Sequence, residues 1–353
     1  MENLPCVGID IAKRTFDVAT FVDGKKKHKQ FKNNIDGFAL LIEWFCQLGI
    51  ARAHVCMEAT GIYGEALSVF LHETGHRVSV VNPARIHGFA LSQLQRAKTD
   101  KADAIVIARF CAAMVPDAWV PPSPATRKLR DLVRHLQALT ENMVHESHRR
   151  DHCISPEVAM RIEDHIWYLK DSINALKKDI MLFVREHPDL SADVKLVETI
   201  PGVGTQTAIT LLAELPNLDC FKSARQLASF VGVTPRLKES GSSVRGKPRL
   251  SKCGNSRLRK ALYFPAIVAR QQNSNVVDFC QRMRQHGKSE MCIIGAVMRK
   301  LIHQVFAVLT KKVPYSDRGD NTSFVSGAHR LQRLRNTTGS GAPPSNPLER
   351  SVV

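Results

Sequence analysis

Cys6-Val7-Gly8-Ile9-Asp10 is a short apolar run that ends in a carboxylate. Ala53-His54-Val55-Cys56-Met57 is a second run of the same kind, and Glu58 ends it. Short apolar runs bounded by polar residues are typical of buried strands. Two carboxylates therefore stand at the ends of two strands that we predict to lie inside an α/β domain.

The segments around these runs alternate between strand and helix periodicity. Residues 14–22 and 27–32 predict a hairpin around Asp23-Gly24, a strong signal for a tight turn. Helices are predicted over 36–48, 63–74 and 99–114, and a further strand over 77–81. The order β-β-β-α-β-α-β-α is that of an RNase H-like fold. By analogy with that fold, the first strand, the fourth strand and the last helix meet at one end.

Asp100 and Asp103 lie three residues apart at the start of the last predicted helix, so they share one face of it. In this fold they converge with Asp10 and Glu58. Clustered carboxylates repel one another unless a cation is present, and hard oxygen ligands suit Mg²⁺, with Mn²⁺ as the alternative. Each carboxylate also has an ordinary structural reading as a turn or cap residue. Glu58 fits that reading least, because Glu is neither a favoured cap nor a good strand former.

Composition narrows the class of partner. The chain has 353 residues, with 50 Lys and Arg against 33 Asp and Glu and a formal charge of +17, which favours a polyanion such as nucleic acid. No stretch approaches the ~20 apolar residues of a membrane span, and the N-terminus has no signal-peptide pattern, so we expect a cytosolic protein. Nine cysteines without a C-x-x-C pair indicate small apolar residues in a reducing compartment, not a disulfide or zinc framework.

Prolines at 121, 122 and 124 end the first domain, 1–120. The next segment, 121–194, carries two runs with the heptad spacing of a coiled coil, at Leu129, Leu132, Leu136, Leu139 and Met143 and at Ile162, Ile166, Leu169, Ile173, Leu176, Ile180 and Phe183. The two helices form either a hairpin within the chain or a dimerisation arm. A mostly α-helical domain follows over 195–316, and 317–353 has the composition of a disordered tail.

Two features of the third domain suit phosphate binding. Ile200-Pro201-Gly202-Val203-Gly204 resembles a helix-hairpin-helix turn, in which Gly202 and Gly204 would let backbone N–H groups approach phosphate; a plain turn is the alternative. Residues 236–260 are densely basic around a polar loop at 239–243, and a solvated basic loop is the alternative there. The cations are Arg236, Lys238, Arg245, Lys247, Arg249, Lys252, Arg257, Arg259 and Lys260.

Five motifs stand in the order seen in one protein family. They are Val7-Gly8-Ile9-Asp10-Ile11-Ala12-Lys13, Glu58-Ala59-Thr60-Gly61, Lys98-Thr99-Asp100-Lys101-Ala102-Asp103-Ala104, Ile200-Pro201-Gly202-Val203-Gly204, and Glu239-Ser240-Gly241 through Arg245-Gly246. With them the chain resembles the DEDD-type insertion-sequence transposases, relatives of the Piv site-specific invertase. Some members of that family are bridge-RNA-guided recombinases. The resemblance covers Pro5 to Pro314.

This resemblance implies a RuvC-like N-terminal domain, a coiled-coil middle and a helical transposase domain. It implies Asp10, Glu58, Asp100 and Asp103 as Mg²⁺ ligands and Ser240 as nucleophile, with Ser242 and Ser243 of the same loop left open. The substrate would be double-stranded DNA, at the element ends and the target. A guide RNA encoded by the element would supply specificity. Because Ser240 lies far from Asp103 in the sequence, a composite site needs domains to dock, either within one chain or between the subunits of the expected homo-oligomer, a dimer or tetramer.

Serine attack suits recombination because the phosphoserine link to DNA retains the energy of the broken bond for rejoining. Attack by water would only cut. Two other functions compete with this one. A RuvC-like junction resolvase with an activated water explains the carboxylates and leaves Ser240 as a DNA contact. A non-catalytic nucleic-acid-binding protein with a vestigial site predicts that carboxylate substitutions are tolerated.

Overall fold

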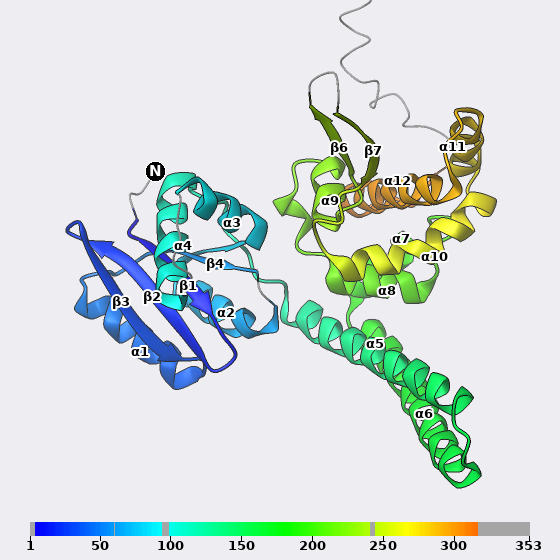
Figure 1. Ribbon diagram of the computed structural model, residues 1–353, viewed down its shortest axis with the longest axis horizontal. Coiled ribbons are helices and arrows are strands. Elements are labelled where there is room, and N and C mark those ends of the chain that lie inside the picture. Colours follow the sequence, from blue (N-terminus) through cyan, green and yellow to red (C-terminus); the bar gives the residue numbers. More distant parts are fainter. Residues whose placement is uncertain (1–3, 60, 94–98, 241–243, 317–353) are drawn as a thin grey trace, which may run out of the picture. The chain divides into compact units, whose positions relative to one another are not determined.

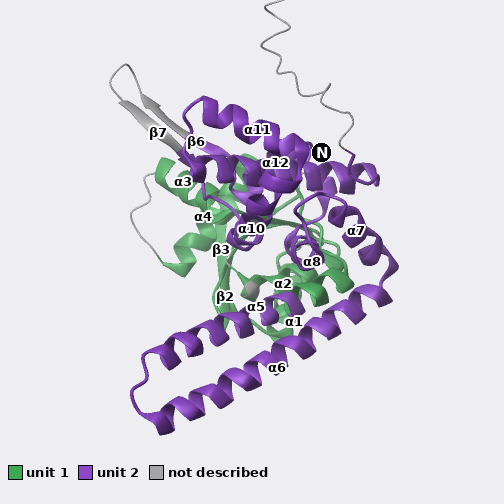
Figure 2. Cartoon of the chain, turned by 90° about the vertical axis from the view of Figure 1, so that its right-hand side faces the viewer, with its two compact units in different colours: residues 1–131 green, residues 132–353 purple. Residues whose placement is uncertain are grey.

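The computed structural model describes residues 4–59, 61–93, 99–240 and 244–316. It divides the chain into two compact units, residues 1–131 and 132–353, which Figure 2 shows in different colours. The tail predicted to be disordered, 317–353, lies outside the described residues.

Unit 1 is built on a five-stranded sheet in the order β3-β2-β1-β4-β5 (Figure 1). β1 (Cys6–Ile11), β2 (Thr15–Val22) and β3 (Lys25–Lys32) form an antiparallel meander. β4 (His54–Glu58) pairs parallel with β1, and β5 (Arg77–Val81) pairs parallel with β4. The mixed α/β domain predicted from the sequence is confirmed.

Helices cover both faces of this sheet. Alternation along β1 sends Val7 and Ile9 into a core with α1 (Ile35–Gln47) and α2 (Glu65–Glu73). A short 3₁₀ turn, η1 (Ile62–Gly64), leads into α2. On the opposite face, the β4 thiol of Cys56 packs with α3 (Pro83–Ser92) and α4 (Asp100–Met114). The second face is therefore the one that carries Asp100 and Asp103.

Gly8 sets how closely α4 approaches the sheet. A Cβ atom at Gly8 would overlap the backbone of Ala104 and Ala108 on α4. Only glycine permits this contact, because every other side chain would push the helix outward. The close approach places the start of α4 beside Asp10, two residues along β1.

The two heptad runs form a helical hairpin. α5 (Pro124–Asp151) and α6 (Pro156–Glu186) lie side by side in both views (Figure 1), and Arg150 pairs with Glu163 across them. The α6 seam residues Ile162, Leu169, Ile173, Ile180 and Phe183 are buried within the single chain. The two heptad runs therefore pack on each other within one chain, with Ile166 and Leu176 half-buried.

Unit 2 continues as a helical domain. α7 (Pro188–Glu198) and α8 (Thr205–Glu214) precede the short turn η2 (Leu218–Cys220) and α9 (Ala224–Val231). α10 (Ser256–Gln272), α11 (Ser274–Gln285) and α12 (Glu290–Lys311) complete it. α12 packs against α7, α9, α10 and α11.

Within the described part of the chain, α12 is the single helix long and apolar enough to cross a membrane. More than half of its most apolar stretch is buried against neighbouring helices. This burial is what a core helix of a folded domain requires, so nothing in it points to a membrane.

The basic segment forms a β-hairpin that the sequence analysis did not predict, and the predicted loop at 239–243 falls at its tip, with Glu239 and Ser240 in the first strand. β6 (Pro235–Ser240) and β7 (Val244–Leu250) are antiparallel, with Ser240 opposite Val244 and an irregularity between Arg236 and Lys238. The prediction missed the strands because Pro, Lys, Arg and Gly hide the alternation that marks a half-buried strand. Gly241, Ser242 and Ser243 lie outside the described residues.

Glu214 at the end of α8 joins three helices of unit 2. Its side chain is 1% exposed, and its two carboxylate oxygens accept hydrogen bonds from Arg134 Nε at 2.7 Å and Nη2 at 3.0 Å. Asn255, the N-cap of α10, adds a longer contact at 3.4 Å. Burial opposes ionisation, but Arg134 outweighs it and holds the pKa of Glu214 below its usual value.

Glu214→Ala is expected to destabilise unit 2 by about 3–5 kcal/mol, because Arg134 would lose its buried partner. Urea unfolding followed by circular dichroism measures the change. Glu141→Ala is the matched control, since its pair with Lys260 is exposed and an exposed pair contributes about 1 kcal/mol or less. Equal losses in the two variants would contradict this role for Glu214.

Candidate active site

Asp10 and Glu58 stand at the carboxyl ends of neighbouring parallel strands. The β1–β4 register pairs Ile9 with Met57, so the next residue of each strand is one of these two acids. Side chains at matching positions of paired strands point to the same face, which here is the α4 face. Both acids are half-buried. The sequence prediction that the two strand ends meet is consistent with this register.

Asp100 and Asp103 occupy the first turn of α4. Thr99 caps the helix: its hydroxyl accepts from Ala102 N at 3.2 Å, and its carbonyl accepts from Asp103 N at 2.8 Å. The positive end of the helix dipole stabilises carboxylates at this position. The cap thus fixes where both side chains leave the helix.

Electrostatics shows that three of the four predicted ligands share one place. Burial, followed by the charges of Asp103 and Asp100, raises the pKa of Asp10 to about 6. Carboxylates couple in this way only when they lie close together. Glu58 is placed with them by the strand register alone.

Asp17 is an acid of this region that sequence reasoning missed. It lies opposite Asp10 in the β1–β2 ladder and is 5% exposed. Its Oδ1 is 2.7 Å from His28 Nε2, and its Oδ2 accepts from Gln30 Nε2 at 2.8 Å. Both oxygens are therefore held by β3, and we do not count Asp17 among the metal donors. Only the strand pairing could have revealed it.

The donor set fits a hard divalent cation. Four carboxylates at one end of a sheet supply only oxygen ligands, which Mg²⁺ and Mn²⁺ prefer. Without a cation the group is electrostatically unfavourable, as the raised pKa of Asp10 shows. Asp10, Glu58, Asp100 and Asp103 are the residues that would hold the ion.

Asp10→Asn is expected to raise the melting temperature of the metal-free protein at pH 8. The folded state holds the Asp10 proton more tightly than the unfolded chain, so ionised Asp10 costs folding free energy as pH rises above the unfolded pKa. After allowance for solvent screening we expect a gain of about 1–2 kcal/mol, or a few degrees.

Differential scanning fluorimetry at pH 8 and pH 4 tests this expectation. The gain should vanish at pH 4, and Mg²⁺ should stabilise the natural protein but not the variant. Asp23→Asn in the exposed β2–β3 turn removes the same charge without a repelling neighbour and serves as control. A metal-free Asp10→Asn protein that melts below the natural one at pH 8 would contradict the cluster.

The cations of unit 2 differ in what they contact. Arg259 Nη1 donates to the carbonyls of Val231 at 2.9 Å and Gly254 at 3.0 Å, so it holds α9 and α10 together. Lys260 pairs with Glu141 at 2.7 Å on an exposed surface. Arg236, Arg249, Lys252 and Arg257 are exposed. Lys238, Arg245 and Lys247 are placed on the hairpin by their backbone alone.

Comparison with known proteins identifies the family. Residues 194–281 match a family profile described as "Transposase IS116/IS110/IS902 family", and residues 7–155 match a second profile described as "Transposase". The chain is 36% identical over 315 residues to the pilin gene-inverting proteins of Moraxella bovis and Moraxella lacunata, covering 88% of this chain and 98% of each relative. The chain belongs to the IS116/IS110/IS902 transposase family. The transposase for insertion sequence element IS1328 of Yersinia enterocolitica is 23% identical over 90% of this chain and all of its own length.

One profile match covers unit 1 and the start of unit 2, and the other lies within unit 2. The first, 7–155, contains all four carboxylates, and the second, 194–281, contains Ser240 and the basic hairpin. Every residue predicted to act in catalysis therefore lies inside a segment that the family shares. The family resemblance inferred from five motifs is confirmed.

The two glycines of the turn at 200–204 have different surroundings. Gly202 has φ +97°, and a Cβ there would collide with Ala269 on α10, so packing explains this glycine. Gly204 is exposed at the N-cap of α8 with open space around it. Of the two, Gly204 has the setting that suits phosphate contact.

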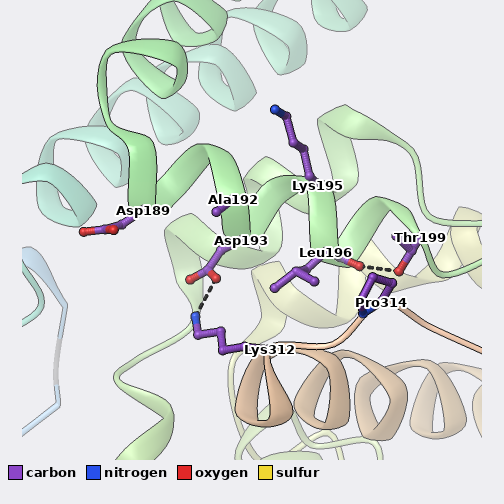
Figure 3. A pocket seen from close by; sticks show the side chains of 8 residues that line it. All are labelled: Asp189, Ala192, Asp193, Lys195, Leu196, Thr199, Lys312 and Pro314. Carbon is purple, nitrogen blue, oxygen red and sulfur yellow. Dashed lines mark hydrogen bonds and ion pairs between the residues drawn. The ribbon is translucent and has the colours of Figure 1, made fainter.

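Two hollows mark the surface of unit 2. The larger, of about 600 Å³, lies beside α7, where Asp193 Oδ1 and Lys312 Nζ pair at 2.5 Å (Figure 3). Its lining carries charges of both signs, including the Asp193–Lys312 pair, and so favours no class of ligand. The smaller, of about 320 Å³, lies at the base of the hairpin, between Leu250, Phe264 and Met291, with Lys252 and Lys260 in its lining. Phe264 is 72% exposed there, an unusual position for a phenylalanine.

Proposed function

We propose that this protein is a DNA transposase or site-specific recombinase that cuts and rejoins DNA strands. The observation that carries the proposal is the coupled carboxylate group at the end of β1, in a chain 36% identical to pilin gene-inverting proteins over most of its length. Ser240 is the proposed nucleophile. Asp10, Glu58, Asp100 and Asp103 form the proposed divalent-metal site, with Mg²⁺ as the expected ion.

The strand order supports an RNase H-like, RuvC-like assignment for the first domain. A three-strand meander followed by two parallel crossovers gives the order β3-β2-β1-β4-β5. In that fold the ends of β1 and β4 and the start of the last helix face one another, and the acids of this chain occupy those positions. The proposed domains remain 1–120, 121–194 and 195–316.

The chemistry assigns each group a task. The Ser240 hydroxyl attacks a DNA phosphorus, a serine–phosphate bond forms, and the displaced 3′- or 5′-oxygen leaves with a proton. A divalent cation held by the carboxylates would stabilise the charge on the attacking and leaving oxygens. The carboxylates themselves hold the negative charge that keeps the ion in place. Reversal by a second strand's hydroxyl rejoins DNA and frees the serine.

The basic hairpin and exposed cations suit a phosphate backbone, and we propose an element-encoded guide RNA beside the DNA substrate. The exposed residues Arg236, Arg249, Lys252 and Arg257 supply charge without base-reading geometry. Sequence choice by a paired RNA fits a protein with this surface. We further propose that the active form is a homo-oligomer.

A reconstituted cleavage assay tests the proposed function. Purified protein, RNA transcribed from the flanks of its gene and labelled element-end DNA are incubated with Mg²⁺ or with EDTA. Recombined DNA in the Mg²⁺ sample alone is the expected result. Cut DNA that is never rejoined would favour the junction-resolvase alternative, and DNA binding without any cutting would favour the non-catalytic one.

Phe264→Ala is expected to weaken binding of single-stranded oligonucleotides by about 5- to 150-fold, because an exposed aromatic ring beside cations is a stacking platform for an unpaired base. Fluorescence anisotropy at several salt concentrations measures it, and the salt slope should not change because no phosphate contact is lost. Trp167→Ala on α6, equally exposed, is the control. Equal affinities of the Phe264→Ala and Trp167→Ala variants would contradict a base-stacking role for Phe264.

A further inference from the structure

Three thiols and one imidazole gather between the sheet and α4, away from the carboxylates. Cys6 on β1, His54 on β4 and Cys111 on α4 place one ligand atom each within 4.8 Å of the others. The thiols of Cys6 and Cys56 both lie within hydrogen-bonding reach of the Cys111 thiol. The sequence has no ligand spacing that predicts this group, because its members come from three elements. The strand pairing, Cys6 with His54, brings the first two together.

The hydrogen bonds of His54 prepare it as a ligand. Its Nε2 is 2.8 Å from Ser79 Oγ, and Ser79 Oγ is 2.8 Å from the carbonyl of Asp117 and 3.1 Å from that of Pro116. The one hydroxyl proton of Ser79 goes to a carbonyl, so Ser79 accepts the proton of Nε2. Nδ1 then keeps a free lone pair. Burial, reinforced by Arg77, lowers the pKa of His54 to about 4, so the ring is neutral. Metal-bound histidines have such a partner on the other nitrogen.

Arg77 adds a positive charge that the cluster leaves uncompensated. Its Nη2 donates to the Pro116 carbonyl at 3.0 Å, whereas its buried Nε finds no acceptor among the described residues. The charge of Arg77 is felt by Cys6, His54 and Cys111 alike. A half-buried guanidinium with an unpartnered Nε beside neutral thiols is a mismatch that a negatively charged centre would offset.

We propose that this group binds one Zn²⁺ through Cys6, Cys111 and His54 Nδ1, with Cys56 as the fourth ligand. On binding, each thiol releases its proton to solvent and its sulfur lone pair bonds to the ion, so nothing is oxidised or reduced. Three thiolates and Zn²⁺ give a net charge of −1 beside Arg77. A mixed Cys and His set is the ligand set of structural zinc, and it differs in kind from the all-oxygen site at Asp10.

The ion would fasten α4 to β1 and β4. Cys111 follows Asp103 by eight residues, or about 12 Å along the helix. Zinc at Cys111 and the close contact at Gly8 would together fix the helix from which Asp103 projects. Zinc binding stands without the proposed function; only the consequence for Asp103 rests on it, and the metal measurement below does not depend on activity.

Elemental analysis of the full-length protein, purified without chelator from zinc-supplemented medium, tests the proposal. We expect about one zinc per chain in the natural protein and in the control Cys46→Ser, whose thiol is exposed on α1. The Cys6→Ser/Cys111→Ser variant should hold less than about a tenth of that, and Ser79→Ala should bind zinc about 10- to 100-fold more weakly in a competition titration.

Cobalt substitution of the natural protein gives a second readout that needs no variant to fold. Tetrahedral d–d bands with a thiolate-to-cobalt charge-transfer band support the site. The proposal is wrong if the natural protein contains no zinc and shows none of these bands after cobalt substitution. It is also wrong if the Cys6→Ser/Cys111→Ser variant holds as much zinc as the natural protein. An intact mass lower by two hydrogens, from a Cys6–Cys111 disulfide, also overturns it.

Discussion

Asp103→Asn is expected to abolish Mg²⁺-dependent strand cleavage while leaving DNA affinity within about twofold of the natural protein. The variant removes one proposed oxygen ligand and one negative charge, and the charge of Asp103 has the largest effect of any charge on the pKa of Asp10. Loss of a ligand that positions a catalytic ion removes several kcal/mol of transition-state stabilisation, which is about 10³-fold or more in rate. Binding should survive because the cations that we propose as phosphate contacts belong to unit 2.

The measurement is single-turnover cleavage of labelled element-end DNA, with a gel-shift assay alongside. Asp23→Asn, which also removes one carboxylate from unit 1 but lies in an exposed turn, should cut at the natural rate. Asp103→Asn protein that cleaves as fast as this control would end the assignment of Asp103 to a metal site.

The Asp103→Cys variant distinguishes a metal-binding role of Asp103 from a purely structural one. A thiolate binds Mg²⁺ poorly and softer ions well, so the variant should be inactive with Mg²⁺ and regain part of its activity with Mn²⁺ or Cd²⁺. A structural defect would not respond to the choice of metal. Rescue that appears equally in Asp103→Ala would contradict coordination through this side chain.

The sequence predicted unit 1 well because its pattern is local. Each strand of the sheet is a short run with clear ends, and the Thr99 cap together with Asp100 and Asp103 marks the start of α4. Strand ends and a helix start are what position the carboxylates, so the candidate site followed from the same signals. That the four carboxylates meet at one end of the sheet followed only from the assumed fold, not from these local signals.

Features that depend on pairing between distant residues escaped prediction. Asp17 is recognisable only from its place opposite Asp10 and its bonds to His28 and Gln30 on another strand. The Cys6–His54–Cys111 group joins elements up to 105 residues apart. The β6–β7 hairpin was not predicted, because its charged residues, prolines and glycine hide the alternation typical of a strand. In each case the information lies in the contact, not in the spacing.

Ser240→Ala is expected to eliminate covalent protein–DNA complexes and rejoining entirely. The structure places Ser240 as the last residue of β6, paired with Val244 of β7. An alanine there keeps the strand and removes only the hydroxyl. Because no other group forms the serine–phosphate bond, the expected loss is complete and not graded.

Denaturing electrophoresis of a reaction with labelled element-end DNA is the measurement. Natural protein should carry the label, and Ser240→Ala should carry none while still binding DNA in a gel shift. Ser242→Ala and Ser243→Ala, outside the described residues but only two and three positions away, are the matched controls and should both trap DNA.

The pattern of covalent trapping across the three serine variants distinguishes attack by serine from attack by water. The carboxylates are compatible with both mechanisms. Trapping lost in Ser242→Ala or Ser243→Ala and kept in Ser240→Ala would preserve serine chemistry and move the nucleophile within the loop. Cut DNA free of protein in every variant, the natural one included, would mean that water attacks. In that case the carboxylate site would still cleave, but the energy of the broken bond would be lost to solvent, and rejoining would need a source that neither unit supplies.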